Sequence, residues 1–194
     1  MQRGPLAVVL GLVGLLVVGI LVLQSGLWVS VLGVGEYDEG TVTVREGTTG
    51  TASGTTTETA TQSENATTVA VRDDAERLAT VEVRIADTGP KRYLGLSNTT
   101  SLEPNEGMLF VHDEEGEYGY VMRDMDFPLD IIFVDANGTI TTIHHAPLPP
   151  EGTSESELKE YSGQGKYVLE VNRGWANRTG VTVGDRVELP AGVA

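Results

Sequence analysis

Apolar and polar residues follow three patterns along this chain. Leu6 to Leu23 is an unbroken apolar run without a charged side chain. Residues 36–68 are rich in Thr, Gly, Ser and Glu and offer little to bury. From about Val69, short apolar or alternating segments return, separated by turn residues. The patterns predict a tail over 1–5, a transmembrane anchor with its apolar extension over 6–34, a stalk over 35–68 and a globular domain over 69–194.

The apolar run has the length of a membrane span. Eighteen helical residues rise about 27 Å, close to the ~30 Å hydrocarbon core of a bilayer. Arg3 precedes the run, and the acidic residues Glu36, Asp38 and Glu39 follow it, which predicts a cytoplasmic N-terminus and an exported domain. Trp28 suits the aromatic belt at the outer interface. The alternative is a secreted domain released by signal cleavage, but such apolar regions usually have ~7–15 residues and no A-x-A-like site follows.

The Thr-rich region is expected to be a disordered stalk, because it cannot offset the entropy cost of ordering. Within it, Thr41 to Val44 alternates like a strand. An isolated short strand is not stable, so this alternation does not change the prediction.

The domain is predicted to be mainly β, an α+β arrangement with short helices, forming a closed or partly closed barrel. Leu129 to Val134 is apolar on both faces, as expected of a central strand, and Asn137-Gly138 predicts a tight hairpin turn after it. Short helices are expected at Lys91–Leu96 and Trp175–Thr179. The expected strands are 80–85, 107–111, 117–122, 129–134, 139–143, 166–171 and 186–189.

The charge of the predicted exported part excludes some partners. From Glu36 onward there are 12 basic and 28 acidic residues, a formal charge of −16. Such a surface repels nucleic acid and anionic lipid, so no nucleic-acid partner is expected. The excess favours a halophilic source, where molar salt screens charges over ~3 Å; an ordinary acidic surface is the alternative. The chain has no cysteine, which excludes disulfides, cysteine metal sites and thiol catalysis, and no cofactor is predicted.

Four of the six asparagines begin an Asn-x-Thr sequon on the predicted outer side. The alternative is that each serves a turn or cap, which is strongest for the hairpin asparagine. We expect at least one to be glycosylated. The four are Asn65, Asn98, Asn137 and Asn177.

The histidines give weak signals. His144 and His145 are adjacent, so on a strand they point to opposite faces and cannot easily share one metal. His112 lies beside three acidic residues, where a solvated acidic turn is favoured over a metal site, and no metal is predicted. The sequence has no HExxH, GxSxG, phosphate-binding glycine loop or dinucleotide fingerprint.

The densest mixture of charged, aromatic and methionine residues spans 118–130. In one interpretation Arg123 grips an anionic or hydroxylated ligand in a pocket. In the other, which we favour slightly, Arg123 pairs internally with an aspartate and fixes the loop before the central strand. The candidate ligand-binding or structural cluster comprises Arg92, Met108, Met122, Arg123, Asp124 and Asp130.

Several segments, in order, resemble the family known as domain of unknown function 192. They are Arg92–Leu96, Glu106–Val111, Met122–Met125, Pro128–Asp135, Tyr167–Val171 and Gly180–Asp185. The resemblance implies a compact, β-rich, often exported domain with no established activity. That family usually has Trp-Met-Lys-Asn-Thr where this chain has Val-Met-Arg-Asp-Met over 121–125, so a ligand bound there would differ.

Three functions remain open. The first is a membrane-anchored binding or interaction module of the cell envelope, with a small molecule or envelope protein as partner. The second is a hydrolase or lyase using Glu106, Asp124 and Asp130, which requires carboxyls ~5–9 Å apart in one cleft. The third is a purely structural envelope protein. A pocket gathering Arg123 with two carboxylates would favour a site, and a filled barrel would favour structure.

Overall fold

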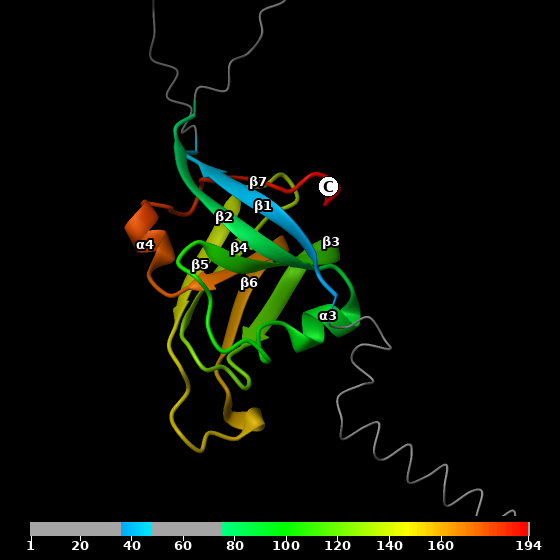
Figure 1. The fold of residues 1–194 in the computed structure, drawn as a ribbon, viewed down its shortest axis with the longest axis vertical. Coiled ribbons are helices and arrows are strands. Elements are labelled where there is room, and N and C mark those ends of the chain that lie inside the picture. Colours follow the sequence, from blue (N-terminus) through cyan, green and yellow to red (C-terminus); the bar gives the residue numbers. More distant parts are fainter. Residues whose placement is uncertain (1–35, 48–74, 194) are drawn as a thin grey trace, which may run out of the picture.

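The computed structural model describes residues 36–47 and 75–193; the apolar run and most of the predicted stalk lie outside these ranges. The described residues form one seven-stranded mixed sheet, curled into a half-barrel (Figure 1). Its strand order is β5-β4-β6-β3-β2-β1-β7. The strands are β1 Asp38–Arg45, β2 Arg77–Ala86, β3 Glu106–Val121, β4 Leu129–Val134, β5 Ile140–Ala146, β6 Glu160–Asn172 and β7 Arg186–Glu188. The helices are α3 Gly89–Leu94, the 3₁₀ turn η1 Glu155–Glu157 and α4 Trp175–Thr179.

Strand β1 lies where the sequence predicted a disordered stalk, and for these eight residues the prediction was wrong. β1 pairs antiparallel with β2 and with β7. Val42 and Val44 are fully buried in the core between these elements. The alternation at Thr41–Val44 therefore forms a stable strand because two neighbours, both distant in sequence, supply its hydrogen bonds and its core.

The two edges of the sheet meet at one end, which produces the curl. Thr139, just before β5, forms a bridge with Arg186 at the start of β7. Val187 donates a backbone hydrogen bond of 2.7 Å to the carbonyl of Gly138. This contact limits the exposed edges, as in barrels. The mainly β class and a partly closed sheet are confirmed.

Two cores cover the two faces of the sheet. The first, inside the curl, joins β1, β2 and α4 through residues such as Val42, Val83 and Trp175. The second lies on the other face and includes Met108, Phe110 and other residues under α3. Alternate residues of a strand face opposite sides, so β4, buried at all six positions, contributes to both cores.

Sequence patterns within single segments predicted several elements correctly. Gly138 has φ 82° in the β4–β5 turn, and Gly180 ends α4 with φ 78°. The two strands predicted at 107–111 and 117–122 are one long strand, β3, whose pairing with β6 is interrupted between Val111 and Gly116. Within the described ranges, no helix is long and apolar enough to cross a membrane.

Candidate functional site

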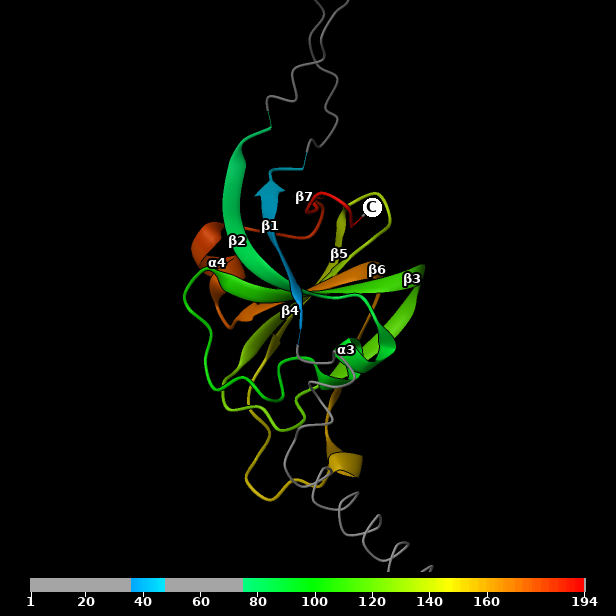
Figure 2. The same ribbon diagram turned by 45° about the vertical axis from the view of Figure 1, so that its right-hand side comes forward.

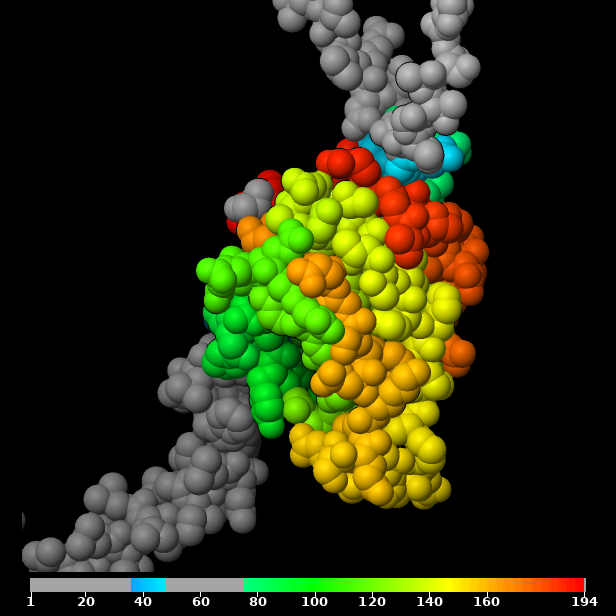
Figure 3. Space-filling view, turned by 180° about the vertical axis from the view of Figure 1, so that it is seen from behind, coloured from blue at the N-terminus to red at the C-terminus, as the bar shows by residue number. Residues whose placement is uncertain are grey.

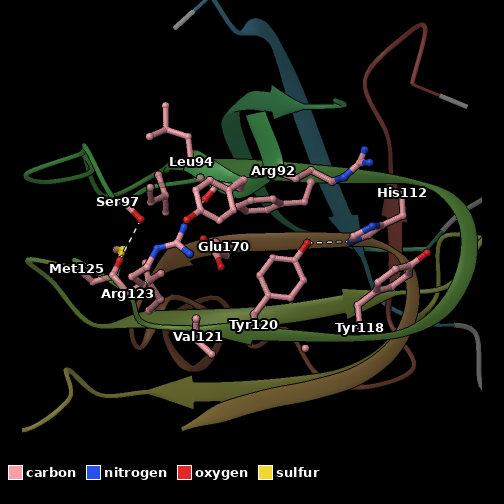
Figure 4. A pocket seen from close by; sticks show the side chains of 16 residues that line it. Arg92, Leu94, Ser97, His112, Tyr118, Tyr120, Val121, Arg123, Met125 and Glu170 are labelled. Carbon is pink, nitrogen blue, oxygen red and sulfur yellow. Dashed lines mark hydrogen bonds between the residues drawn. The ribbon is translucent and has the colours of Figure 1, made fainter. Parts of the chain in front are cut away.

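A pocket of about 290 Å³ opens between α3 and the second half of β3, over β6. In Figure 3 the surface is hollowed between the green α3 segment and the orange β6 segment. Figure 4 shows side chains from three elements directed toward this space. The lining residues are Arg92–Ser97, Phe110, His112, Tyr118–Val121, Arg123, Met125, Leu129 and Glu170.

Helix α3 is held close to the sheet by its two ends. The Thr88 side chain accepts a hydrogen bond from the Lys91 amide, which caps the helix start, and proline occupies the first turn. Gly95 ends the helix with φ 51°. A Cβ at Gly95 would lie 3.3 Å from the ring of Phe110, so glycine permits both the turn and the close approach.

Glu170 lies at the base of the pocket, in the middle of the sheet. It pairs with Met108 on β3 and Ile131 on β4, and both neighbours are fully buried. Glu170 itself is 5% exposed, and among the described residues no side chain or backbone group hydrogen-bonds to its carboxyl. Burial raises the pKa of Glu170 to about 8, so this carboxyl is largely neutral at pH 7.

An aromatic wall stands beside Glu170. His112 Nε2 lies 2.9 Å from the Tyr120 hydroxyl, and the His112 ring stacks on Tyr118 with centroids 3.5 Å apart. Burial, and next the charge of Arg92, lower the pKa of His112 to about 4. Burial also raises the pKa of Tyr120, and the charge of neighbouring Glu170 raises this pKa further. Neutral His112 therefore accepts the hydrogen bond that the Tyr120 hydroxyl donates.

Arg123 lies at the rim, in the loop that follows β3. Its guanidinium carbon lies 4.2 Å from the centroid of the Tyr93 ring, and the group donates to the Tyr93 carbonyl. Its other nitrogen lies 3.5 Å from the exposed carboxylate of Glu155. The Ser97 hydroxyl donates to the Arg123 carbonyl at 3.0 Å (Figure 4). These contacts join α3 to the loop across the pocket.

Arg92 also lines the pocket, but its charge is directed along the sheet. Its guanidinium donates to the carbonyls of Asp87 and Val111 at 3.0 and 2.7 Å. The Asp113 carboxylate is 4.0 Å away. Arg92 therefore braces α3 against β2 and β3, and it lowers the pKa of His112.

The remaining members of the predicted cluster lie elsewhere. Met108 and Met122 are buried in the second core. Asp124 is exposed, with φ 52° in the loop. Asp130 is fully buried on the opposite face of β4, where it accepts hydrogen bonds from His145 Nδ1 at 2.7 Å and the Ala176 amide at 3.0 Å. The sequence therefore placed two of six residues, Arg92 and Arg123, in the pocket.

The expected internal Arg–Asp pair does not form among the described residues. Arg123 pairs with the carboxylate of Glu155, and Asp130 pairs with His145 instead. The reason is strand alternation: Asp130 points away from the pocket, whereas its neighbour Leu129 lines it.

The three carboxylates suggested for catalysis do not share the pocket. Glu106 is exposed at the start of β3, Asp124 lies in the loop and Asp130 is on the other face of the sheet. The pocket gathers Arg123 with one carboxyl, Glu170, rather than two.

The histidines and sequons occupy positions consistent with their patterns. His144 contacts Phe133 and the carbonyl of Ser162 on one face, and His145 contacts Asp130 on the other. Within 36–47 and 75–193, no three histidine or acidic side chains are placed to hold a metal ion. Three sequon asparagines are exposed, and Asn65 lies outside the described residues. The exposed three are Asn98, Asn137 and Asn177.

Sequence reasoning missed Glu170 and the aromatic wall. The signal for Glu170 was present, because a single acid interrupts the apolar strand Tyr167–Val171. Its two buried neighbours become visible only with the sheet register. The wall depends on the interruption between Val111 and Gly116 in β3, for which the sequence offers no clear marker.

The domain is a half-barrel of one mixed sheet, with a pocket between the short helix α3 and strand β3. The chain belongs to the family domain of unknown function 192 (DUF192), described as "Uncharacterized ACR", whose model matches residues 69–189. No curated protein matches the chain.

Two solved structures share the fold. One is a "putative transcription regulator" from Sinorhizobium meliloti 1021, with 26% identity, a TM-score of 0.58, and coverage of 79% of this chain and 95% of that one. The other is a protein of unknown function from Novosphingobium aromaticivorans DSM 12444, with 25% identity, a TM-score of 0.54, and coverage of 77% and 84%.

Proposed function

We propose that this protein is a membrane-anchored extracytoplasmic binding domain whose pocket holds a small ligand with an anionic or hydroxylated group. The pocket volume of about 290 Å³ is just below the ~300–1,000 Å³ common for ligand sites. It combines aromatic and apolar walls with a few polar groups, as ligand sites usually do.

Glu170 carries the proposal. This residue is 5% exposed and lines the pocket, and a largely buried carboxyl that no neighbouring group hydrogen-bonds is costly. A ligand that enters the pocket supplies the missing partner. A neutral carboxyl can donate a hydrogen bond to an anion or share one with a hydroxyl.

Arg123 adds the second anchoring group. It is held by Tyr93 from behind and faces only an exposed carboxylate, Glu155, on its other side. Exposed ion pairs contribute little, so a ligand carboxylate or phosphate can replace Glu155 at small cost. Arg123 and neutral Glu170 then bind the same polar group from two sides.

This proposal includes the membrane anchor, the outward-facing domain, the halophilic setting and glycosylation at the sequons. They rest on the sequence of 1–35, on the formal charge of −16 and on the exposure of the described sequons. Although the Sinorhizobium meliloti protein is called a "putative transcription regulator", we propose no DNA binding for this chain, because its acidic surface repels phosphate backbones. A filled, purely structural barrel does not account for the pocket.

Mass spectrometry of small molecules released from the purified full-length protein tests the proposal. The wild-type chain, extracted from its native membranes, should release a molecule that is lost from Glu170→Leu and reduced in Arg123→Ala. Arg186→Ala, at the other end of the sheet, is the matched control and should retain it. Circular dichroism checks that each variant is folded. Identical released material from all four proteins contradicts the proposal.

A further inference from the structure

The two ends of β1 lie at opposite ends of the domain. At its start, the Tyr37 hydroxyl donates to the Lys91 carbonyl at 3.4 Å, and Lys91 Nζ lies 3.7 Å from Asp38, beside α3. At its end, the Glu46 amide donates to the carbonyl of Glu76 at 2.8 Å. Figure 2 shows α3 beside the beginning of β1 and β7 beside its arrowhead. Eight residues of strand place these ends about 26 Å apart.

The connection to residues 48–74 is therefore at the end remote from α3. Glu46 and Glu76 are hydrogen-bonded to each other, and the Gly47 amide donates to Asp185 at 2.9 Å near β7. The Thr-rich segment is an insertion between β1 and β2 rather than a spacer between the apolar run and the domain.

We propose that the α3 end of the domain, defined by Tyr37, Tyr93, Val121 and Leu148, faces the membrane surface. The inference rests on the anchor of the proposed function. Nine residues, 29–37, separate Trp28 at the predicted outer interface from β1, and they reach at most about 32 Å when extended. The chain enters the domain from the predicted anchor at the start of β1, so the α3 end is the end nearest to the anchor along the chain.

The distribution of exposed apolar side chains supports this orientation. Among the described residues, four large apolar side chains are exposed. Tyr93 lies on α3, Val121 ends β3, and Leu148 follows β5, all at the α3 end. Val183 lies near β7. Tyrosine is favoured at membrane interfaces, where its ring is buried and its hydroxyl stays hydrated.

Attraction between charges does not explain this contact, because the domain is acidic and repels anionic headgroups. The entry of the chain at the α3 end and the apolar side chains bring this surface to the bilayer. The pocket lies at the same end, since Leu94 and Gly95 line both it and the neighbouring groove that contains Tyr37. Its ligand is therefore taken up beside the membrane surface, and the residues that flank the Thr-rich insertion, Glu46 and Glu76, lie at the opposite end of the domain.

The absence of cysteine permits a clean test with single-cysteine variants of the full chain. Asn98→Cys reports on the α3 end, and Val183→Cys reports on the opposite end as its matched control. Each is labelled with a donor fluorophore and reconstituted into phosphatidylcholine vesicles that carry an acceptor lipid. Flotation separates bound from free protein, and circular dichroism confirms folding.

The expected result is that both variants float and that energy transfer to the lipid acceptor is at least twofold higher from position 98. Equal transfer, or higher transfer from position 183, in protein that floats overturns the orientation and leaves the anchor intact. Protein that does not float overturns the anchor and the orientation together.

Discussion

The Arg123 guanidinium stacks on the Tyr93 ring at 4.2 Å and donates to the carbonyl of the same residue. One side chain thus makes two contacts with one residue of α3, and both contacts lie at the pocket rim. Arg123 therefore links the loop after β3 to the helix, while the Glu155 pair is a minor addition at the surface.

Arg123→Ala should lower the free energy of unfolding by about 1–2 kcal/mol, because a partly exposed cation–π contact and a charged hydrogen bond are lost. Arg123→Lys should recover part of this, since lysine keeps the charge but not the planar stack. Glu155→Gln is the control and should cost less than about 0.5 kcal/mol. Urea denaturation measures all three. A cost for Glu155→Gln equal to that for Arg123→Ala would show that the ion pair dominates.

Asp130→Ala should be more destabilising, by about 2–3 kcal/mol, because the buried Ala176 amide loses its acceptor. His145→Gln should cost less than about 1 kcal/mol, since this histidine is partly exposed and water can replace its partner. Chemical denaturation at pH 7 gives both values. A stability of Asp130→Ala within 0.5 kcal/mol of wild type, on the order of the error for surface changes, would contradict the capping role.

The raised pKa of Glu170 should make the stability of the folded domain depend on pH in an unusual way. Its pKa is about 8 in the folded protein and ~4.3 in the unfolded chain, so the folded state binds the proton more tightly. The stabilisation is complete below pH ~4.3, is lost progressively as pH rises to about 8, and changes little above that. Glu170→Gln removes this contribution, because glutamine stays neutral throughout.

Urea denaturation of wild type and Glu170→Gln at several pH values measures this difference. Between pH 5 and 9, wild type should lose several kcal/mol relative to the variant, on the scale of ~1.4 kcal/mol per pKa unit. Glu117→Gln, at an exposed position on β3, should follow wild type. Parallel stability curves for wild type and Glu170→Gln would show that the carboxyl is charged and solvated in the folded state.

Patterns confined to one segment were sufficient for much of the fold. The apolar run of β4 and the Asn137-Gly138 turn specify their own structure, and Gly180 ends α4 as expected. Strand β1 could not be predicted in this way, because its partners begin at Arg77 and Arg186. Its stability comes from non-local pairing, for which a short window contains no information.

The candidate site was harder to predict than the fold. Arg92 and Arg123 were found because charged residues among aromatics are conspicuous in sequence. The expected Arg123–Asp130 pairing failed because it needs the face of each strand residue relative to the loop. Glu170 acquires its character from Met108 and Ile131, which are 62 and 39 positions earlier in the chain.

The formal charge of −16 predicts that salt stabilises the domain. Molar salt shortens the screening length to ~3 Å and reduces repulsion between the acidic side chains. The melting temperature of the full chain should therefore rise steadily in a potassium chloride series. A melting temperature that stays constant or falls would remove the argument for a halophilic setting.

Proteolysis tests the predicted topology and the position of the Thr-rich insertion together. Glutamyl endopeptidase added to intact cells should cut after Glu58 or Glu64, which lie between β1 and β2. Because β1 remains paired with β2 and β7, the cut chain should stay on the membrane under native conditions and appear as two fragments on a denaturing gel. Urea at ~6 M should then release the C-terminal fragment, since unfolding separates the strands.

Two other outcomes of this experiment are informative. Cleavage only after cell lysis would contradict the outward orientation of the domain. Release of the C-terminal fragment by cutting alone, without denaturant, would mean that β1 does not hold the domain to the anchor. A full-length variant with Val42→Asp and Val44→Asp is the internal control, because two buried charges should break the pairing of β1 and permit release without urea.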